Sequence, residues 1–375
     1  MPGQGQGQQG RPGQFPQPGQ QDRDRTQLPD MQRPIFLSGK VMLEDGTPPP
    51  ESVVIERVCN NVIRPEAYTD SKGRFSFQLG QNSTVFADAS VGSTMDDPFS
   101  RNDSAMGRGA GQRQISERDL MGCELRASLA GFRSEAVSLS GRRMMDNPDV
   151  GTIILRRLGN VEGYTFSAIS AQAPKDAKKA FEKGREQAKK NKLAEAQKEY
   201  EKAVQVYPKY ATAWYDLGLL YEKQNNVEGA RDAFEKAIGA DPKYVNPYLN
   251  LTALAARASK WQDTADISAR AIKLNPFDFP QAYFYNSVAN LNLNNLEAAE
   301  KSAKEAKKLD SRNRIPKINH LLGVILAQKQ DYPGAAESFK AYIAMAPNAP
   351  DVDTVKKQLA EIDKALGEKT QAAQQ

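Results

Sequence analysis

The sequence predicts a multidomain chain in which an N-terminal all-β sandwich is followed by an all-α superhelical solenoid. Three observations in its 375 residues support this prediction. Apolar residues alternate with a period of two between residues 33 and 158, which is typical of strands. From residue 175 onward the period becomes helical, and a unit of 34 residues recurs. The use of charge changes at the same place, since only 2 of the 28 lysines precede residue 175.

The first 32 residues are rich in Gly, Gln and Pro. Such a segment cannot bury enough apolar surface to offset the entropy lost on ordering, so we expect a disordered arm over residues 1–32. The arm lacks the apolar core of a secretory signal peptide. An exported form of this protein would therefore need a signal outside the given sequence.

The β region is expected over residues 33–158. Ile35, Leu37 and Val41 share one face of the first strand, and Gly- or Asp-containing turns separate it from the strands that follow. A polar stretch at residues 91–119, whose role the sequence does not assign, precedes a strand that begins at Cys123. About seven short strands without a helical pattern favour a small sandwich.

Turn and strand motifs in this region resemble the carboxypeptidase regulatory-like domain. The motifs are Gly39-Lys40-Val41, Asp45-Gly46-Thr47-Pro48 and the segment from Thr69 to Phe77. The resemblance implies a transthyretin-like sandwich, which is sometimes grouped with carbohydrate-binding folds. The family carries no catalytic residues of its own, so no site is transferred from it.

The helical region repeats a fixed order of small, aromatic and proline residues. Its second unit is the fullest and contains Trp214, Leu217, Gly218, Tyr221, Ala230, Phe234, Ala237 and Pro242. Small residues let two antiparallel helices approach closely, and proline ends the second helix because it lacks an amide hydrogen. The pattern resembles the tetratricopeptide repeat. It predicts a linker at 159–174, five units over residues 175–350 and a capping helix over 351–369.

The resemblance also implies a binding surface. In this family, side chains of each first helix face a concave groove. Carried over residue by residue, the groove positions expected to bind a partner include Tyr215, Asn246, Tyr283, Ser287 and Asn290, with Tyr215 and Tyr283 one place after the position of Trp214. Asn250 is added because it directly follows the groove position Leu249. Amides and tyrosines suit recognition of a peptide or protein segment. The alternative is an ordinary polar surface without a partner.

The composition argues against several other classes of protein. With one histidine, His320, and two cysteines, the chain lacks the ligands of a zinc finger or a four-thiolate iron–sulfur cluster, and we expect no metal, cofactor or catalytic residue. The longest aliphatic stretch, Leu321–Ala327, is far shorter than the roughly 20 residues of a membrane span. The net charge of +5 comes from lysines interspersed with glutamates, which does not favour nucleic acid.

Cys59 and Cys123 both lie at the edges of predicted strands. They could form one disulfide, which would indicate a periplasmic or secreted protein, or they could be two buried thiols in a cytoplasmic one.

The sequence therefore predicts a non-enzymatic scaffold that binds a protein or peptide in the concave groove. The alternative is a carbohydrate- or envelope-binding module in which the sandwich binds a glycan and the solenoid is a spacer. Exposed aromatic residues on the sandwich would favour that alternative, but Phe36, Phe75 and Phe77 are expected in its core.

Overall fold

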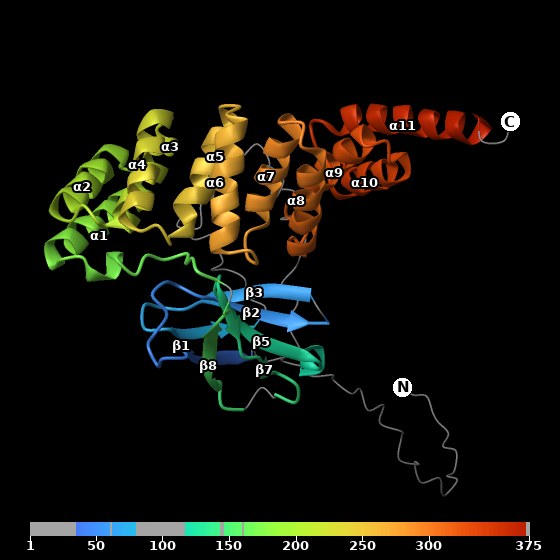
Figure 1. The fold of residues 1–375 in the computed structure, drawn as a ribbon. Coiled ribbons are helices and arrows are strands. Elements are labelled where there is room, and N and C mark those ends of the chain that lie inside the picture. The colour runs from blue at the N-terminus through green and yellow to red at the C-terminus, as the bar shows by residue number, and fades with distance from the viewer. Residues whose placement is uncertain (1–34, 61, 80–116, 143–145, 160, 373–375) are drawn as a thin grey trace, which may run out of the picture. The chain divides into compact units, whose positions relative to one another are not determined.

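The computed structural model describes residues 35–60, 62–79, 117–142, 146–159 and 161–372. The arm expected over residues 1–32 and most of the polar stretch 91–119 lie outside these residues. Strands occupy the chain from Phe36 to Arg157, and helices follow from Lys175 onward (Figure 1). The predicted fold class, a β-sandwich followed by a helical solenoid, is confirmed.

Eight strands form two four-stranded sheets within the described residues. They are β1 (Phe36–Leu43), β2 (Val54–Cys59), β3 (Val62–Tyr68), β4 (Arg74–Gln78), β5 (Cys123–Ser128), β6 (Phe132–Ser134), β7 (Val137–Ser138) and β8 (Asp149–Arg157). The strand orders are β4-β1-β8-β6 and β3-β2-β5-β7. Strands β1 and β8 run parallel, and the other paired strands run antiparallel.

Strand β3 was not predicted, because Pro65 interrupts its pattern. The structure places β3 at the edge of its sheet, and the pairing with β2 is irregular between Ile55 and Glu56, next to Pro65. Proline is tolerated at edges and irregularities because no ladder hydrogen bond is lost there. The local sequence alone therefore understated the number of strands.

The alternation predicted for the first strand is confirmed. Leu37 and Val41 are fully buried and pack with Phe75 and Phe77 in the core between the sheets. Phe36 differs from the expectation, because it occupies the opposite face of β1 and is 53% exposed.

The two cysteines lie opposite each other on neighbouring strands. Cys59 ends β2 and pairs in register with Cys123 at the start of β5, with their Cα atoms 4.2 Å apart. The structure joins them by a disulfide that closes a loop with a sequence separation of 64.

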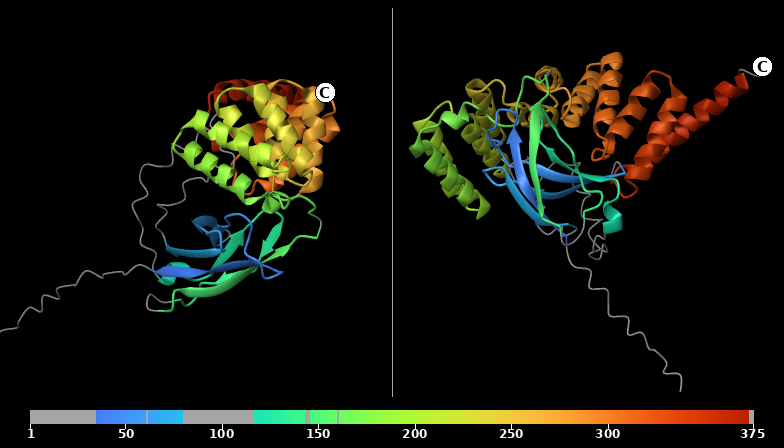
Figure 2. Two further views of the ribbon diagram at one scale, coloured as in Figure 1. Left: turned by 90° about the vertical axis from the view of Figure 1, so that its left-hand side faces the viewer. Right: turned by 90° about the horizontal axis from the view of Figure 1, so that it is seen from below.

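Eleven helices follow within the described residues. They are α1 (Lys175–Lys189), α2 (Leu193–Val206), α3 (Ala211–Lys223), α4 (Val227–Ala240), α5 (Val245–Arg257), α6 (Trp261–Leu274), α7 (Pro280–Asn292), α8 (Leu296–Leu309), α9 (Lys317–Gln328), α10 (Tyr332–Met345) and α11 (Val352–Ala372). The helices follow one another in a single row, as Figure 1 and the right-hand view of Figure 2 show. We call α1, α3, α5, α7 and α9 the first helices and their partners α2, α4, α6, α8 and α10 the second helices.

The row has no single core. Successive clusters of buried residues join neighbouring pairs: one spans α1 to α3, others link α3 to α9, and the last links α8 to α11. Within a pair, Gly218 lies so close to Phe234 that an added Cβ would be 2.5 Å from the ring. Gly184 and Gly323 lie equally close to Tyr200 and Phe339. The predicted role of the small residues as close-approach positions is confirmed.

The turn between the helices of each pair has a signal that the sequence pattern missed. The second residue after each first helix adopts a left-handed backbone, with φ between 56 and 61°. These residues are Asn191, Asn225, Ser259, Asn294 and Gln330. Asparagine tolerates this conformation better than most residues, and three of the five are asparagines.

The fourth unit is displaced by one residue from the predicted alignment. Four residues (241–244) separate α4 from α5, whereas five (275–279) separate α6 from α7. The buried alanine of the fourth unit is consequently Ala299, while Ala298 is exposed. Before the fifth unit, seven residues (310–316) separate α8 from α9, three more than the four between α4 and α5.

The expected capping helix is α11, which continues beyond the predicted end at residue 369. Val355 and Ile362 are buried against the last helix pair. Among the described residues, no helix combines the length and the apolar character needed to cross a bilayer.

Candidate functional site

The side chains of the first helices form the candidate site, which we call the first-helix face. On it, a hydrogen-bonded ion pair joins α1 to α3: Arg185 Nε lies 2.8 Å from Asp216 Oδ2. The same guanidinium lies over the ring of Phe181, 4.8 Å from its centroid. The charge of Asp216 raises the pKa of Arg185 above its already high value. The arginine is therefore fixed on the surface by two neighbours.

A second polar network joins α3 to α5. Arg257 Nη2 donates to Glu222 Oε1 over 2.7 Å, and Asn250 Nδ2 donates to Glu222 Oε2 over 3.1 Å. Tyr215 Oη in turn donates to Asn250 Oδ1 over 3.3 Å. Because these bonds connect successive first helices, they fix the spacing of the surface that the helices present.

Burial raises the pKa of Glu222 above its usual value of 4.5, and Arg257 offsets only part of this effect. The folded chain therefore holds this proton more tightly than the unfolded chain. The stability that the group contributes is full below pH 4.5 and is lost as the pH rises through the raised pKa.

We predict that Glu222→Gln removes this pH dependence. The free energy of unfolding of the variant, minus that of the wild type, should increase between about pH 4 and about pH 7. Urea titrations followed by circular dichroism at several pH values measure the difference. Glu182→Gln, on the exposed side of α1, is the matched control and should change less. A difference that falls as the pH rises would contradict the prediction.

Two of the predicted partner-binding residues are buried in the second and third units. Tyr215 is 2% exposed, because its ring packs 5.7 Å from Phe234 and 5.3 Å from Tyr244. Asn250 is 9% exposed and is held by Tyr215 and Glu222. Both side chains support the surface from beneath and do not offer polar atoms to a partner.

The displaced register explains where the candidate residues of the fourth unit lie. Tyr283 was expected one place after the position of Trp214, but the structure gives it the same role as that residue. Trp214 Nε1 donates to Pro208 O, Tyr248 Oη to Pro242 O and Tyr283 Oη to Pro276 O, over 2.9 to 3.2 Å. Tyr283 therefore anchors the preceding turn.

The same displacement moves the other two candidates. Ser287 is fully buried at the glycine place, where its Oγ donates to Ala299 O over 2.7 Å. Asn290 is half-buried, and its Nδ2 donates to the backbone and side chain of Asn286 in its own helix. The structure does not gather these side chains on one open surface.

Asn246 is the remaining candidate and lies half-buried in the first turn of α5. Its Nδ2 donates to Thr165 O, 3.1 Å away, in the segment that joins the sandwich to α1. This residue already binds a peptide backbone, which belongs to the chain itself.

The sequence reasoning missed Glu222 and Arg257, which complete the first-helix face. Their signal was their place on the repeat. Glu222 is the second-last residue of α3, and Arg257 is the last residue of α5. Opposite charges at these two places predict an ion pair between successive first helices.

His320 is part of the contact between α9 and the capping helix. Its Nε2 lies 3.0 Å from Gln358 Oε1, and its ring packs 5.3 Å from that of Tyr342. Within the described residues, no three His, Cys, Asp or Glu side chains are grouped so as to hold a metal ion.

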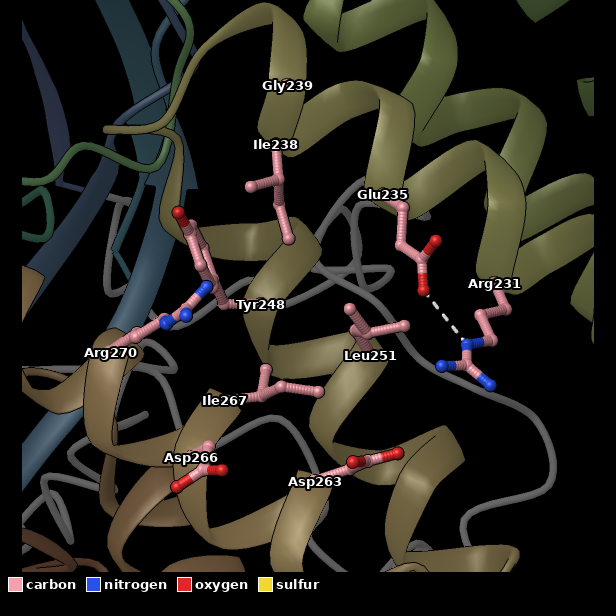
Figure 3. Close-up of a pocket in the computed structure, with 10 residues that line it drawn as sticks. All are labelled: Arg231, Glu235, Ile238, Gly239, Tyr248, Leu251, Asp263, Asp266, Ile267 and Arg270. Atoms are coloured by element: carbon pink, nitrogen blue, oxygen red, sulfur yellow. Dashed lines mark hydrogen bonds and ion pairs between the residues drawn. The ribbon is translucent and has the colours of Figure 1, made fainter.

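A cleft of about 460 Å³ opens between the second helices α4 and α6, with α5 as its floor (Figure 3). Ile238, Tyr248, Leu251 and Ile267 form its apolar part. Arg231 and Glu235, whose charged groups are 2.9 Å apart, lie on one side, and Asp263, Asp266 and Arg270 lie on the other. An apolar floor with charged edges suits docking of a side chain or helix.

Comparison with known proteins supports the repeat assignment. Residues 181–245 and 316–350 match the tetratricopeptide repeat family. The match identifies tetratricopeptide repeats in these two stretches, and the helix pairs between them continue the same row. The resemblance of the sandwich to the carboxypeptidase regulatory-like domain stays a prediction. No curated protein sequence matches the chain.

Several solved structures are similar to part of the chain. YrrB, described as a TPR protein with an unusual peptide-binding site, is 23% identical, with a TM-score of 0.44 over 51% of this chain and 98% of its own. MamA from Desulfovibrio magneticus RS-1 is 17% identical, with a TM-score of 0.42 over 48% and 99%. A tetratricopeptide repeat protein from Parabacteroides merdae is 15% identical, with a TM-score of 0.43 over 53% and 77%.

Proposed function

We propose that this chain is a non-enzymatic scaffold that binds a peptide or protein segment on the first-helix face. The observation that supports this function most directly is a pair of oriented arginines on the first helices. Arg185 on α1 is held by Asp216 on α3, and Arg257 on α5 is held by Glu222 on α3. Side chains that are already ordered lose little entropy when a partner binds them.

Apolar area lies beside these arginines. Leu219, Leu249 and Ala253 are half-buried on α3 and α5, so each retains some exposed surface. An extended segment or a helix with small apolar side chains and acidic or amide groups would match this combination. The partner we propose is a protein of that chemistry.

We predict that Ala253→Arg reduces partner binding at least about tenfold, which corresponds to about 1.4 kcal/mol. The added side chain would cover the apolar area formed with Leu219 and Leu249. Tagged full-length protein should be used to capture partners from extract of the source, with quantitative mass spectrometry as the measurement.

Ala269→Arg is the matched control, since Ala269 is exposed on the second helix α6. It should bind the same partners as the wild type, and both variants should keep the wild-type circular dichroism. Equal binding by the two variants would refute the proposal for the first-helix face.

The alternative glycan-binding function is not supported. Of the three aromatic residues considered for it, Phe75 and Phe77 are in the core, and only Phe36 is exposed. A single ring does not make the stacking platform on which a sugar-binding sandwich would rely.

The compartment is also a proposal. Disulfides persist in oxidising compartments and are rare where thiols are kept reduced. The Cys59–Cys123 bond therefore supports a periplasmic or secreted location. Alkylation of the protein in intact cells should leave both cysteines unmodified until a reductant is added; modification without reductant would favour the cytoplasm.

A further inference from the structure

The segment Val161–Ala173, expected to be a plain linker, lies on the solenoid with its backbone hydrogen-bonded. Tyr164 N donates to Lys243 O over 2.9 Å, and Val245 N donates to Tyr164 O over 2.8 Å. Glu162 N and Gly163 N both donate to Leu274 O, at 3.0 and 2.9 Å. This is the pattern by which proteins bind an extended peptide through its main chain.

Two of the three solenoid atoms in these bonds, Val245 N and Leu274 O, belong to helix ends. Val245 is the first residue of α5, and Leu274 is the last residue of α6. Amides at the start of a helix and carbonyls at its end have no partner within the helix. The turns between units therefore expose both a donor and an acceptor for an extended strand.

Side chains of the solenoid extend the contact along the segment. Asn246 Nδ2 donates to Thr165 O over 3.1 Å, and Ser167 Oγ donates to Asp241 Oδ2 over 2.6 Å. Asp241 and Ser167 are each 6% exposed. A hydroxyl on the bound strand thus provides the partner of an otherwise buried carboxylate.

The fit is closest at Gly163. A Cβ added to this buried residue would lie 2.5 Å from Val245 Cγ2 and 2.8 Å from Leu274 Cβ. Only glycine allows the backbone to approach the two helix ends at this distance. The site therefore selects glycine at one position and a hydroxyl four residues later.

We propose that the strip formed by Asp241–Asn246 and Leu274 is a binding site for an extended peptide, and that the chain's own residues 162–170 occupy it. An external segment of the same kind, with glycine followed four residues later by serine or threonine, binds there once the internal one leaves. This proposal does not rest on the function proposed for the first-helix face, although Val245 and Asn246 belong to the first helix α5.

The occupant in the chain has a large advantage over an external peptide. A short tether gives it an effective concentration of the order of millimolar. The wild-type protein should therefore bind a free peptide of the same sequence weakly. A variant whose own segment cannot occupy the site should bind that peptide well.

The test uses three full-length chains: the wild type, Gly163→Leu and the control Gly159→Leu. At exposed Gly159 an added Cβ has no neighbouring atom within 4 Å. The probe is a fluorescent peptide of residues 159–173, measured by anisotropy. We expect it to bind Gly163→Leu at least tenfold more tightly than the other two chains. The same peptide carrying Leu for Gly163 should bind none of them.

Hydrogen exchange shows whether the internal segment has left, because the amide of Val245 should exchange faster in Gly163→Leu. If that variant loses helical circular dichroism, Tyr164→Pro replaces it, since proline removes the N–H that Lys243 O accepts. Equal peptide binding by all chains, no binding to a variant with a released segment, or binding of the Leu-containing peptide would each overturn the proposal.

Discussion

Phe234→Ala is expected to destabilise the helical array by about 3 to 5 kcal/mol. The ring is fully buried where α3 and α4 cross, between Gly218 and Tyr215. Glycine on the opposing helix leaves no side chain that could move into the space vacated by the ring, so a cavity should remain. In a solenoid, each pair is stabilised only by its neighbours, so the loss is not shared by a common core.

Urea denaturation followed by far-UV circular dichroism measures this loss. Phe277→Ala makes the same chemical change at a residue that is 45% exposed, and it should alter the free energy of unfolding by no more than about 0.5 kcal/mol. Hydrogen exchange should show the Phe234→Ala effect concentrated in α3 and α4. Similar losses in both variants would contradict the packing described for the repeat.

Removal of the disulfide is expected to destabilise the β-sandwich by about 4 kcal/mol, from the entropy that a loop of this length regains in the unfolded chain. The bond joins β2 to β5 across a sequence separation of 64. Cys59→Ala combined with Cys123→Ala should therefore lower the denaturation midpoint of the sandwich and leave that of the helices less changed.

Reduced wild-type protein is the control for the altered side chains. It should denature at nearly the same point as the double variant, and reductant should not change the variant further. A wild-type midpoint that is insensitive to reductant would show that the bond contributes little to stability.

Local patterns predicted most of the architecture. Alternation located β1 and β5 because one face of each strand must be buried. The repeat of glycine, aromatic and proline located the helix pairs because the two helices of a pair must cross closely and the second helix must end. Where Ser287 and Ala303 stand in place of that glycine and aromatic, the pattern weakened, and the single extra residue in 275–279 went unnoticed.

The candidate site was predicted less well. Repeat position indicated which helices form the surface, but not which of their side chains stay accessible. Tyr215 is buried because Tyr244, 29 residues later, packs against it, and Tyr283 turns back to Pro276 because its unit is displaced. Such contacts depend on the neighbouring unit and are not contained in the periodicity of one helix.

The sequence by itself determined that strands precede helices and that the helices form five repeats, because these features follow from spacing within short stretches of chain. Only the tertiary structure decided that Cys59 faces Cys123, that α3 and α5 share a polar network, and that residues 162–170 lie on the solenoid. The physical reason is that almost any residue can form a backbone hydrogen bond to a distant part of the chain, so such bonds hardly affect the sequence. Burial of one face of a strand or helix, in contrast, requires apolar residues at regular intervals.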